Sequence, residues 1–280
     1  MFKSINQLIR SRTISTNILE NIYRILGREC IENILTAEKY ANPLRLERFG
    51  FKVYSQNEED GIIEEIFKRI GTRNQTFVEF GVQNGRENNT LYLFQKGWQG
   101  VWLEGDEEYF KQINKTFASY IKKSSLKVQD SFVTRENIDS ILRSFSLPRE
   151  LDLLCIDIDG NDYYVWDAIM CLSPRVVVIE YNAKFPPPTR WVMNYDQHHI
   201  WDGSDYFGAS LSALTELADK KGYFLICCNI AGVNAFFVRK DLVENKFQAP
   251  FTAENYYQPA RYYLREAIFA GHPCSGKLNE

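Results

Sequence analysis

The sequence predicts an α/β protein in which helices cover both faces of a mostly parallel, Rossmann-like sheet. From Thr76 onward, short apolar segments typical of strands alternate with segments of helical character. Two of the apolar segments, residues 151–156 and 176–179, are almost continuously hydrophobic, as strands buried on both faces of a parallel sheet are. Strands that alternate with helices in this way favour a parallel sheet between two helical layers.

The elements are expected in a regular order. Residues 55–58 have the form of a helix capping box, and the helix that follows ends at Gly71. Gly61 lies inside this helix at a cost of about 1 kcal/mol relative to alanine, which indicates that a ligand or another backbone approaches closely. A helix over 210–222 and a hairpin after it end the series. The strands between them are expected at 76–80, 100–104, 126–129, 151–157 and 176–181, the helices at 90–96, 107–117, 135–145 and 162–170, and the hairpin at 223–228 and 233–239.

The chain is expected to have three parts. Residues 1–50 form a helical N-terminal extension, residues 51–240 the α/β domain, and residues 241–280 a C-terminal extension. Within the domain, residues 182–207 are too long and too aromatic for a simple connector and are expected to form a lid or substrate loop. The segment before Glu20 is basic and amphipathic, so it is suited to packing on the domain, to packing on a second subunit, or to weak peripheral contact with an anionic membrane.

Composition narrows the class of protein. The 280 residues carry 33 lysines and arginines against 36 acids, a net charge of -3, which leaves no excess charge for a nucleic-acid partner. No segment reaches the roughly 18 to 20 consecutive apolar residues of a transmembrane helix. The six cysteines include no C-x-x-C pair and are read as reduced, as in a cytoplasmic protein.

A glycine loop follows the first strand of the expected sheet. Its form is acid-x-Gly-x-x-x-Gly, with Glu79, Gly81 and Gly85 at the defined positions. A dinucleotide-binding loop has a further glycine where Gln83 stands, so this loop is poorly suited to binding a pyrophosphate. The Glu79 carboxylate suits a ligand with an ammonium group, and the glycine turn leaves room for an uncharged ribose and an amino-acid tail.

Two more acids end the next two strands. Glu104 lies 25 residues after Glu79, where a carboxylate can accept both hydroxyl groups of a ribose. Asp130 follows, at a position that can reach the amino group of an adenine ring. Each acid alone could be a helix cap or a solvated turn residue, but three in register at the carboxyl edge of a sheet favour a ligand site.

These features together resemble class I S-adenosylmethionine-dependent methyltransferases. The resemblance rests on the Glu79–Gly85 loop, Glu104, Asp130 and Asp157 in this order, followed by the terminal hairpin. Three finer motifs, at residues 55–61, 156–160 and 206–210, are similar to FkbM-like methyltransferases found among bacterial surface-polysaccharide and natural-product genes. Those relatives commonly carry Glu where this chain has Asp159, and residues 181–205 match none of their patterns.

The resemblance implies both a fold and a donor. The sheet would have seven strands with the last one antiparallel, and residues 51–240 would be a methyltransferase domain. The methyl donor would be S-adenosylmethionine (SAM), and transfer would usually go to oxygen. The residues expected to bind this donor are Gln56, Glu79, Gly81, Gly85, Glu104, Asp130 and Asp157.

Transfer to oxygen also needs the acceptor hydroxyl to lose its proton, to a base or with the help of a metal. Asp157 and Asp159 at one strand end, with Glu180 and Asn182 at the next, offer oxygen ligands suited to Mg²⁺. The alternative is that Asp157 and Asp159 cap the helix after Gly160 and contact the donor.

The candidate bases are Asp157 and two histidines of the expected lid, His198 and His199. The alternative for the histidines is an exposed loop position without a role. Trp201 of the same loop is suited either to stacking on a sugar ring or to packing the loop down.

The sequence thus predicts a SAM-dependent O-methyltransferase that acts on a sugar, a surface polysaccharide or a natural-product hydroxyl. Its partner would be a small-molecule or glycan acceptor, and a homo-oligomer is consistent with the sequence. The expected location is the cytoplasm, and weak peripheral contact at the inner membrane face is kept as a minor alternative. Two alternatives stay open: a nicotinamide-dependent oxidoreductase or epimerase, against which the missing G-x-G-x-x-G counts, and a non-catalytic SAM-binding module.

Overall fold

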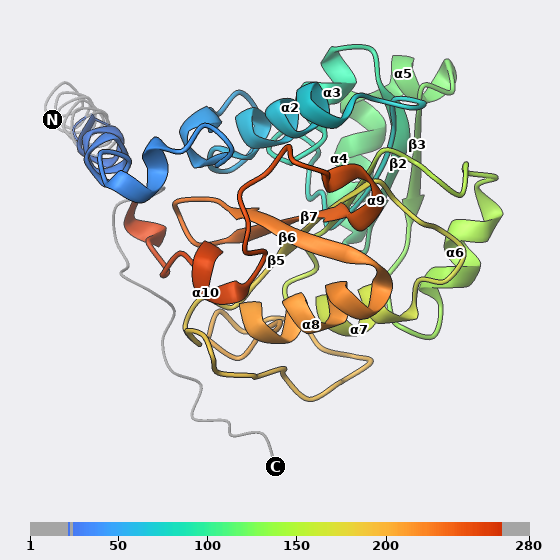
Figure 1. The fold of residues 1–280 in the computed structure, drawn as a ribbon. Helices are drawn as coiled ribbons and strands as arrows, with labels where there is room; N and C mark the ends of the chain where they lie inside the picture. Colours follow the sequence, from blue (N-terminus) through green and yellow to red (C-terminus); the bar gives the residue numbers. More distant parts are fainter. Residues whose placement is uncertain (1–21, 23–24, 265–280) are drawn as a thin grey trace, which may run out of the picture.

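Seven strands form one sheet in the computed structural model, which describes residue 22 and residues 25–264 (Figure 1). The strand order is β3-β2-β1-β4-β5-β7-β6. β7 runs antiparallel to both of its neighbours, and the other pairs are parallel. The predicted Rossmann-like sheet is therefore confirmed, including its antiparallel last strand. The strands are β1 Thr76–Phe80, β2 Gln99–Glu104, β3 Leu126–Asp130, β4 Leu153–Ile156, β5 Val176–Glu180, β6 Tyr223–Cys228 and β7 Asn234–Arg239.

Helices cover both faces of this sheet. Figure 1 shows α2, α3 and α4 on one side of the strands and α7 and α8 on the other. The α-helices are α2 Glu59–Ile70, α3 Leu91–Gln95, α4 Glu107–Thr116, α5 Ala118–Lys122, α6 Ile138–Ser144, α7 Asp162–Ala168, α8 Leu211–Lys221, α9 Lys240–Val243 and α10 Ala253–Tyr256. Residues 25–34 are also helical, and short 3-10 turns form η1 Glu38–Ala41, η2 Glu47–Phe49 and η3 Tyr262–Leu264.

Alternation along the strands divides the core into two layers. In β1, Phe77 packs with Ile62 and Ile66 of α2, whereas Val78 belongs to the layer that contains Trp166 of α7 and Leu214 of α8. Successive side chains of a strand point to opposite faces, so a strand buried on both faces must be apolar throughout. This is why the central strands read as continuous hydrophobic runs.

The start of α2 differs from the predicted capping box. The helix begins at Glu59, and Glu58 is its N-cap residue without a side-chain cap. The Ser55 hydroxyl instead accepts a hydrogen bond from the amide of Asp60, while Glu58 accepts one from the amide of Ile230 in the turn between β6 and β7. The capping-box prediction is wrong because the residue that accepts from the Ser55 amide is Asp60, in the first turn of the helix, whereas the Glu58 side chain turns to the hairpin.

The prediction for Gly61 is confirmed, with a backbone as the close neighbour. A Cβ atom at Gly61 would lie 2.1 Å from the carbonyl oxygen of Phe49 and 2.4 Å from the amide nitrogen of Phe51. The Gly61 amide also donates to the carbonyl of Phe51 at 3.1 Å. A glycine at this position therefore lets the segment before α2 lie directly on the helix.

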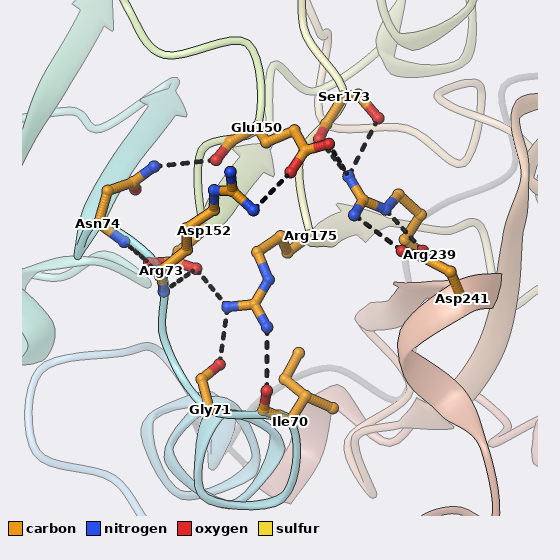
Figure 2. A network of polar contacts seen from close by, with 10 residues as sticks. All are labelled: Ile70, Gly71, Arg73, Asn74, Glu150, Asp152, Ser173, Arg175, Arg239 and Asp241. Carbon is orange, nitrogen blue, oxygen red and sulfur yellow. Dashed lines mark hydrogen bonds and ion pairs between the residues drawn. The ribbon is translucent and has the colours of Figure 1, made fainter.

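A buried ion pair lies at the amino ends of the strands (Figure 2). Asp152, before β4, pairs with Arg175, before β5, at 2.7 Å, and it also accepts hydrogen bonds from the amides of residues 73–75. Arg175 donates in addition to the carbonyls of Ile70 and Gly71 at the end of α2. This network ties α2 to the sheet at the edge opposite the carboxyl ends of the parallel strands.

The described parts of the two predicted extensions pack on the sheet and on each other. The Tyr181 hydroxyl donates to the carbonyl of Gln258, whose side-chain amide donates to the hydroxyl of Tyr40. Tyr256 is fully buried in the core. The basic amphipathic start before Glu20 lies outside the described residues.

Two further expectations concern the cysteines and the membrane. Within the part of the chain that the structure describes, no helix is long and apolar enough to cross a membrane. The five cysteines in that part are unpaired, and three of them, Cys155, Cys227 and Cys228, are buried.

Candidate functional site

A cavity of about 380 Å³ opens where the carboxyl ends of β1, β4 and β5 meet. Its wall includes residues predicted for the donor and residues predicted for the acceptor chemistry, from segments far apart in the sequence. These are Gln56, Glu79, Gly81, Asp157, Asp159 and Glu180. A second cavity, of about 450 Å³, lies between α8, β6 and the segment around α10, and contains none of the predicted site residues. The first cavity is therefore the candidate site.

Glu79 is fully enclosed at the end of β1. One carboxylate oxygen accepts from the amide of Asn89 at 2.8 Å, and the other from the amide of Thr90 at 3.2 Å and from the Thr90 hydroxyl. Burial raises the pKa of Glu79 from 4.5 to about 7, although these hydrogen bonds favour the charged form. A cation that binds beside Glu79 would restore its charge at neutral pH.

The glycine loop uses its own amides within the protein. The amide of Gly81 donates to the carbonyl of Leu103, that of Gln83 to the Glu104 carboxylate, and that of Gly85 to the carbonyl of Val82. A phosphate-binding loop needs such amides to point at its ligand. The turn here is therefore unsuited to a pyrophosphate.

The two glycines are needed for different contacts. At Gly81, with φ +71°, a Cβ atom would lie 1.7 Å from the carbonyl oxygen of Asp157, so only glycine lets β1 and the end of β4 approach. At Gly85, with φ +75°, a Cβ atom would lie 2.8 Å from the Trp102 ring. Gly81 lines the cavity, whereas Gly85 packs over Trp102.

Glu104 and Asp130 end β2 and β3 side by side, as register partners. Glu104 is buried, and its two oxygens accept from the amides of Gln83 at 2.6 Å and Asp106 at 2.9 Å. Burial raises the pKa of Glu104 above its ordinary value. Asp130 is exposed. Both acids lie at the carboxyl edge of the sheet, between the cavity and β3. Neither is among the described residues that line the cavity.

Asp157, Asp159 and Glu180 form a compact carboxylate group. One oxygen from each lies within 4.8 Å of the others. The turn that presents the first two is held by Asp162, whose carboxylate accepts from the amides of Ile158 and Gly160. Asn161 is the N-cap residue of α7, so neither Asp157 nor Asp159 holds that position. Three oxygen donors at this spacing match the ligand chemistry of Mg²⁺.

Asn182 has a different environment from the three carboxylates. Its side-chain nitrogen donates to the carbonyls of Asp205 and Phe207, and its oxygen accepts from the amide of Lys184. Asn182 thereby fastens the two ends of the predicted substrate loop to β5. It is not among the described residues that line the cavity.

The two histidines of the substrate loop lie at different depths. His198 is exposed. His199 lies against Gly160, where a Cβ atom would be 2.3 Å from the His199 Cδ2 atom. The Nε2 atom of His199 is buried and has no hydrogen-bond partner in the part of the chain that the structure describes. His199 is thus close to the turn that carries Asp159, and Trp201 from the same loop lines the cavity itself.

Seven residues of the described cavity wall were not predicted as site residues from the sequence: Gln83, Glu87, Asn88, Asn89, Val233, Asn234 and Tyr262. Asn234, the first residue of β7, lies opposite Glu180 in the sheet register. Its side-chain nitrogen donates to Glu59, and its oxygen is buried and has no partner within residues 25–264. Asn88 lies three residues after Gly85 of the glycine loop, and this proximity is a signal that could have been used. The position of Asn234 depends on the pairing of β7 with β5, and that of Tyr262 on how the segment after α10 folds back.

The charge of the wall is one-sided. The described lining residues include five acids, Glu79, Glu87, Asp157, Asp159 and Glu180, and no lysine, arginine or histidine. Like charges in a concave, partly enclosed site focus the potential there. The cavity therefore favours a ligand with net positive charge or a bound cation.

Comparison with known proteins gives structural neighbours only. No protein-family model and no curated protein sequence matches this chain. Among solved structures, magnesium protoporphyrin IX methyltransferase from Synechocystis PCC 6803 with bound SAM is 10% identical, with a TM-score of 0.43 over 66% of this chain and 79% of that one. Precorrin-6y C5,15-methyltransferase from Geobacter metallireducens GS-15 is 14% identical, with a TM-score of 0.41 over 71% and 97%.

A third neighbour is a SAM-dependent methyltransferase from Clostridium acetobutylicum ATCC 824, which is 9% identical with a TM-score of 0.39 over 76% of this chain and 98% of that one. The structural neighbours are thus methyltransferases. At identities this low, the fold rests on the strand order of the sheet itself, and the function rests on the site.

Proposed function

We propose that the protein is a SAM-dependent methyltransferase. The observation that carries the proposal is the cavity itself, which brings Gln56, Glu79, Gly81 and the Asp157 turn together at the carboxyl edge of a sheet of this topology. Ligands of open α/β sheets bind outside the carboxyl ends of the strands.

The residues present fit this donor. SAM carries a sulfonium and an ammonium against one carboxylate, so its net positive charge is complementary to a wall with five acids. Glu79 is suited to the ammonium group, and Glu104 and Asp130 lie at the strand ends where the ribose and adenine would be recognised. Asn88 and Asn234 each have a buried polar atom that no described residue binds, which also supports a site completed by a ligand.

The proposed reaction is O-methylation of a hydroxyl on a sugar, a surface polysaccharide or a natural product. When bound, SAM supplies an electrophilic methyl group. The carbon–sulfur bond breaks as the carbon–oxygen bond forms, and the hydroxyl proton must go to a base. Asp157 is the proposed base, and His199, which lies beside the same turn, is the second candidate. His198, predicted as a base as well, is exposed.

The carboxylate group offers a second way to activate the acceptor. Asp157, Asp159 and Glu180 are the residues that would hold Mg²⁺, and such an ion would lower the pKa of a bound hydroxyl. Trp201 supports a sugar acceptor, because an indole ring stacks well on the apolar face of a sugar. The motif resemblance to FkbM-like enzymes supports the same acceptor class and a cytoplasmic role in polysaccharide biosynthesis.

The competing nicotinamide-dependent function is less well supported. The loop amides are consumed within the protein, and the acidic wall would repel a pyrophosphate. Titration calorimetry with S-adenosylhomocysteine (SAH), SAM and NAD⁺, each with and without Mg²⁺, tests the donor directly. Micromolar binding of the adenosyl ligands and none of NAD⁺ is expected; the reverse would replace the proposal by an oxidoreductase.

The acceptor needs a separate assay. Transfer of a labelled methyl group from SAM to a panel of monosaccharides and glycans, analysed by mass spectrometry, tests the O-methylation proposal. Label on a sugar hydroxyl is expected, with loss of transfer in the Asp157→Ala variant. Binding of SAM that is followed by no transfer to any acceptor would favour the non-catalytic module.

A further inference from the structure

Asn88 lines the cavity with a side-chain amide of which the protein uses only one end. The residue is 6% exposed. Its Oδ1 accepts hydrogen bonds from the amides of Thr90 at 3.2 Å and Leu91 at 2.9 Å, where α3 begins. Its Nδ2 is buried and has no hydrogen-bond partner among the described residues.

Chemistry fixes the orientation of this amide. The amides of Thr90 and Leu91 are donors, so the atom that faces them must be the acceptor oxygen. A flipped side chain would place N–H groups against N–H groups and lose both bonds. The atom left without a partner is therefore the N–H₂ group, a hydrogen-bond donor.

A buried donor without a partner needs an explanation, because buried polar groups in native proteins are nearly always satisfied. The charged groups of the cavity wall are all carboxylates, which would hold the cationic parts of a ligand but not its anionic part. Asn88 directly precedes Asn89, whose amide binds Glu79. The N–H₂ group without a hydrogen-bond partner and the buried Glu79 carboxylate thus belong to the same short stretch of wall.

We infer that Asn88 binds the carboxylate of the donor's amino-acid tail through Nδ2, while Glu79 binds the ammonium group of that tail. In an amino acid these two groups are attached to one carbon. A hydrogen-bond donor (Asn88) for the carboxylate and an acceptor (Glu79) for the ammonium group should therefore lie close together. This inference rests on the proposed function, since it assumes an adenosyl ligand with an amino-acid tail.

The test is the Asn88→Asp variant. An aspartate keeps an oxygen acceptor for the amides of Thr90 and Leu91, so the start of α3 is preserved. It replaces the N–H₂ donor by a negatively charged oxygen that would face the tail carboxylate. The matched control is Asn84→Asp, the same chemical change in the same loop, where Oδ1 accepts only from the amide of Arg86 and the residue is not part of the described cavity wall.

Two ligands separate the tail from the rest of the molecule. SAH carries the amino-acid tail, and 5′-methylthioadenosine carries the adenosine and the thioether without it. Asn88→Asp is expected to weaken SAH at least tenfold and to change 5′-methylthioadenosine less than twofold. Asn84→Asp is expected to change neither affinity.

Equal SAH affinity of Asn88→Asp and wild type would overturn the inference and leave the proposed function intact. Equal weakening of both ligands would also overturn it, because Asn88 would then contact the adenosine. Failure of the wild type to bind any adenosyl ligand would remove the proposed function itself. If Asn88→Asp unfolds, Asn88→Ser is the alternative variant, because it keeps an oxygen acceptor for the start of α3 while it removes the N–H₂ group. Asn88→Ser is again expected to weaken SAH and not 5′-methylthioadenosine.

Discussion

Raising the pH from 5.5 to 7.5 should tighten the binding of SAH through Glu79. Burial raises the pKa of this carboxyl from 4.5 to about 7, and nearby Asp60 pushes it in the same direction. The ligand-free protein therefore holds Glu79 largely protonated at pH 5.5. The ammonium group of the ligand needs the ionised form, so binding at low pH must first remove this proton.

The size of the effect follows from the pKa. Below the pKa of Glu79 in the ligand-free protein, the affinity for SAH rises up to tenfold per pH unit, and it levels off above pH 7. The expected increase from pH 5.5 to pH 7.5 is therefore roughly twentyfold. At pH 7 about half a proton should be released for each ligand bound. The free energy of unfolding of the ligand-free protein changes with pH in the opposite direction. The raised pKa of Glu79 stabilises the folded state below pH 4.5, and about 3 kcal/mol of that stability is lost as the pH rises through 7.

Calorimetry in two buffers with different ionisation enthalpies measures the proton release directly. Glu79→Gln should abolish both the release and the pH dependence. Glu58→Gln is the matched control, because burial raises the pKa of Glu58 to about 7 as well, but Glu58 binds Ile230 outside the cavity wall. A wild-type affinity that stays constant from pH 5.5 to 7.5, without proton release, would refute the assignment of Glu79 to the ammonium group.

Three further substitutions test other parts of the molecule. Glu104→Ala should weaken SAH binding by about 1 to 3 kcal/mol in calorimetry, the cost of leaving ribose hydroxyls without a charged partner; unchanged affinity would exclude Glu104 from the site. Asp157→Ala should retain SAH binding and lose methyl transfer, and transfer at the wild-type rate would refute its role as base. Arg175→Met should lower the free energy of unfolding in urea by about 3 to 5 kcal/mol, because it leaves buried Asp152 unpaired, whereas exposed Asp241→Ala should cost at most about 1 kcal/mol; equal effects would contradict this reasoning.

The fold could be predicted because local signals and burial agree. Val78 and Phe77 lie on opposite faces of β1 and are both enclosed, so the hydrophobic run that identifies the strand is also what its environment requires. Helix starts were harder to predict. The residues at 55–58 match the capping-box pattern, but the N-cap residue of α2 is Glu58, three residues after Ser55. The Glu58 side chain binds the turn between β6 and β7, and nothing in the local sequence indicates that contact.

The clustering of Glu79, Gly81 and Asp157 at one cavity could be predicted for a similar reason. Glu79, Gly81 and Asp157 are attached to strand ends, and parallel strands bring their carboxyl ends to one edge whatever the loops do. Other residues of the wall are placed by contacts between distant segments. Asn234 lies there because β7 pairs with β5. Tyr262 lies there because its neighbour Arg261 binds the carbonyls of Ile230 and Ala231 and places this segment on the hairpin turn. Contacts between segments so far apart produce no recognisable pattern in the sequence.

The motif at residues 55–61, before and at the start of α2, is connected to a distant residue of the cavity wall. Glu59 is completely buried and accepts hydrogen bonds from the side-chain amides of Asn57, Asn229 and Asn234. By holding the nitrogen of Asn234, Glu59 determines that the oxygen of this amide is the atom left without a partner in the cavity wall. The motif therefore contributes Gln56 to the wall directly, whereas its buried acid acts at a distance, by orienting a residue 175 positions later in the chain.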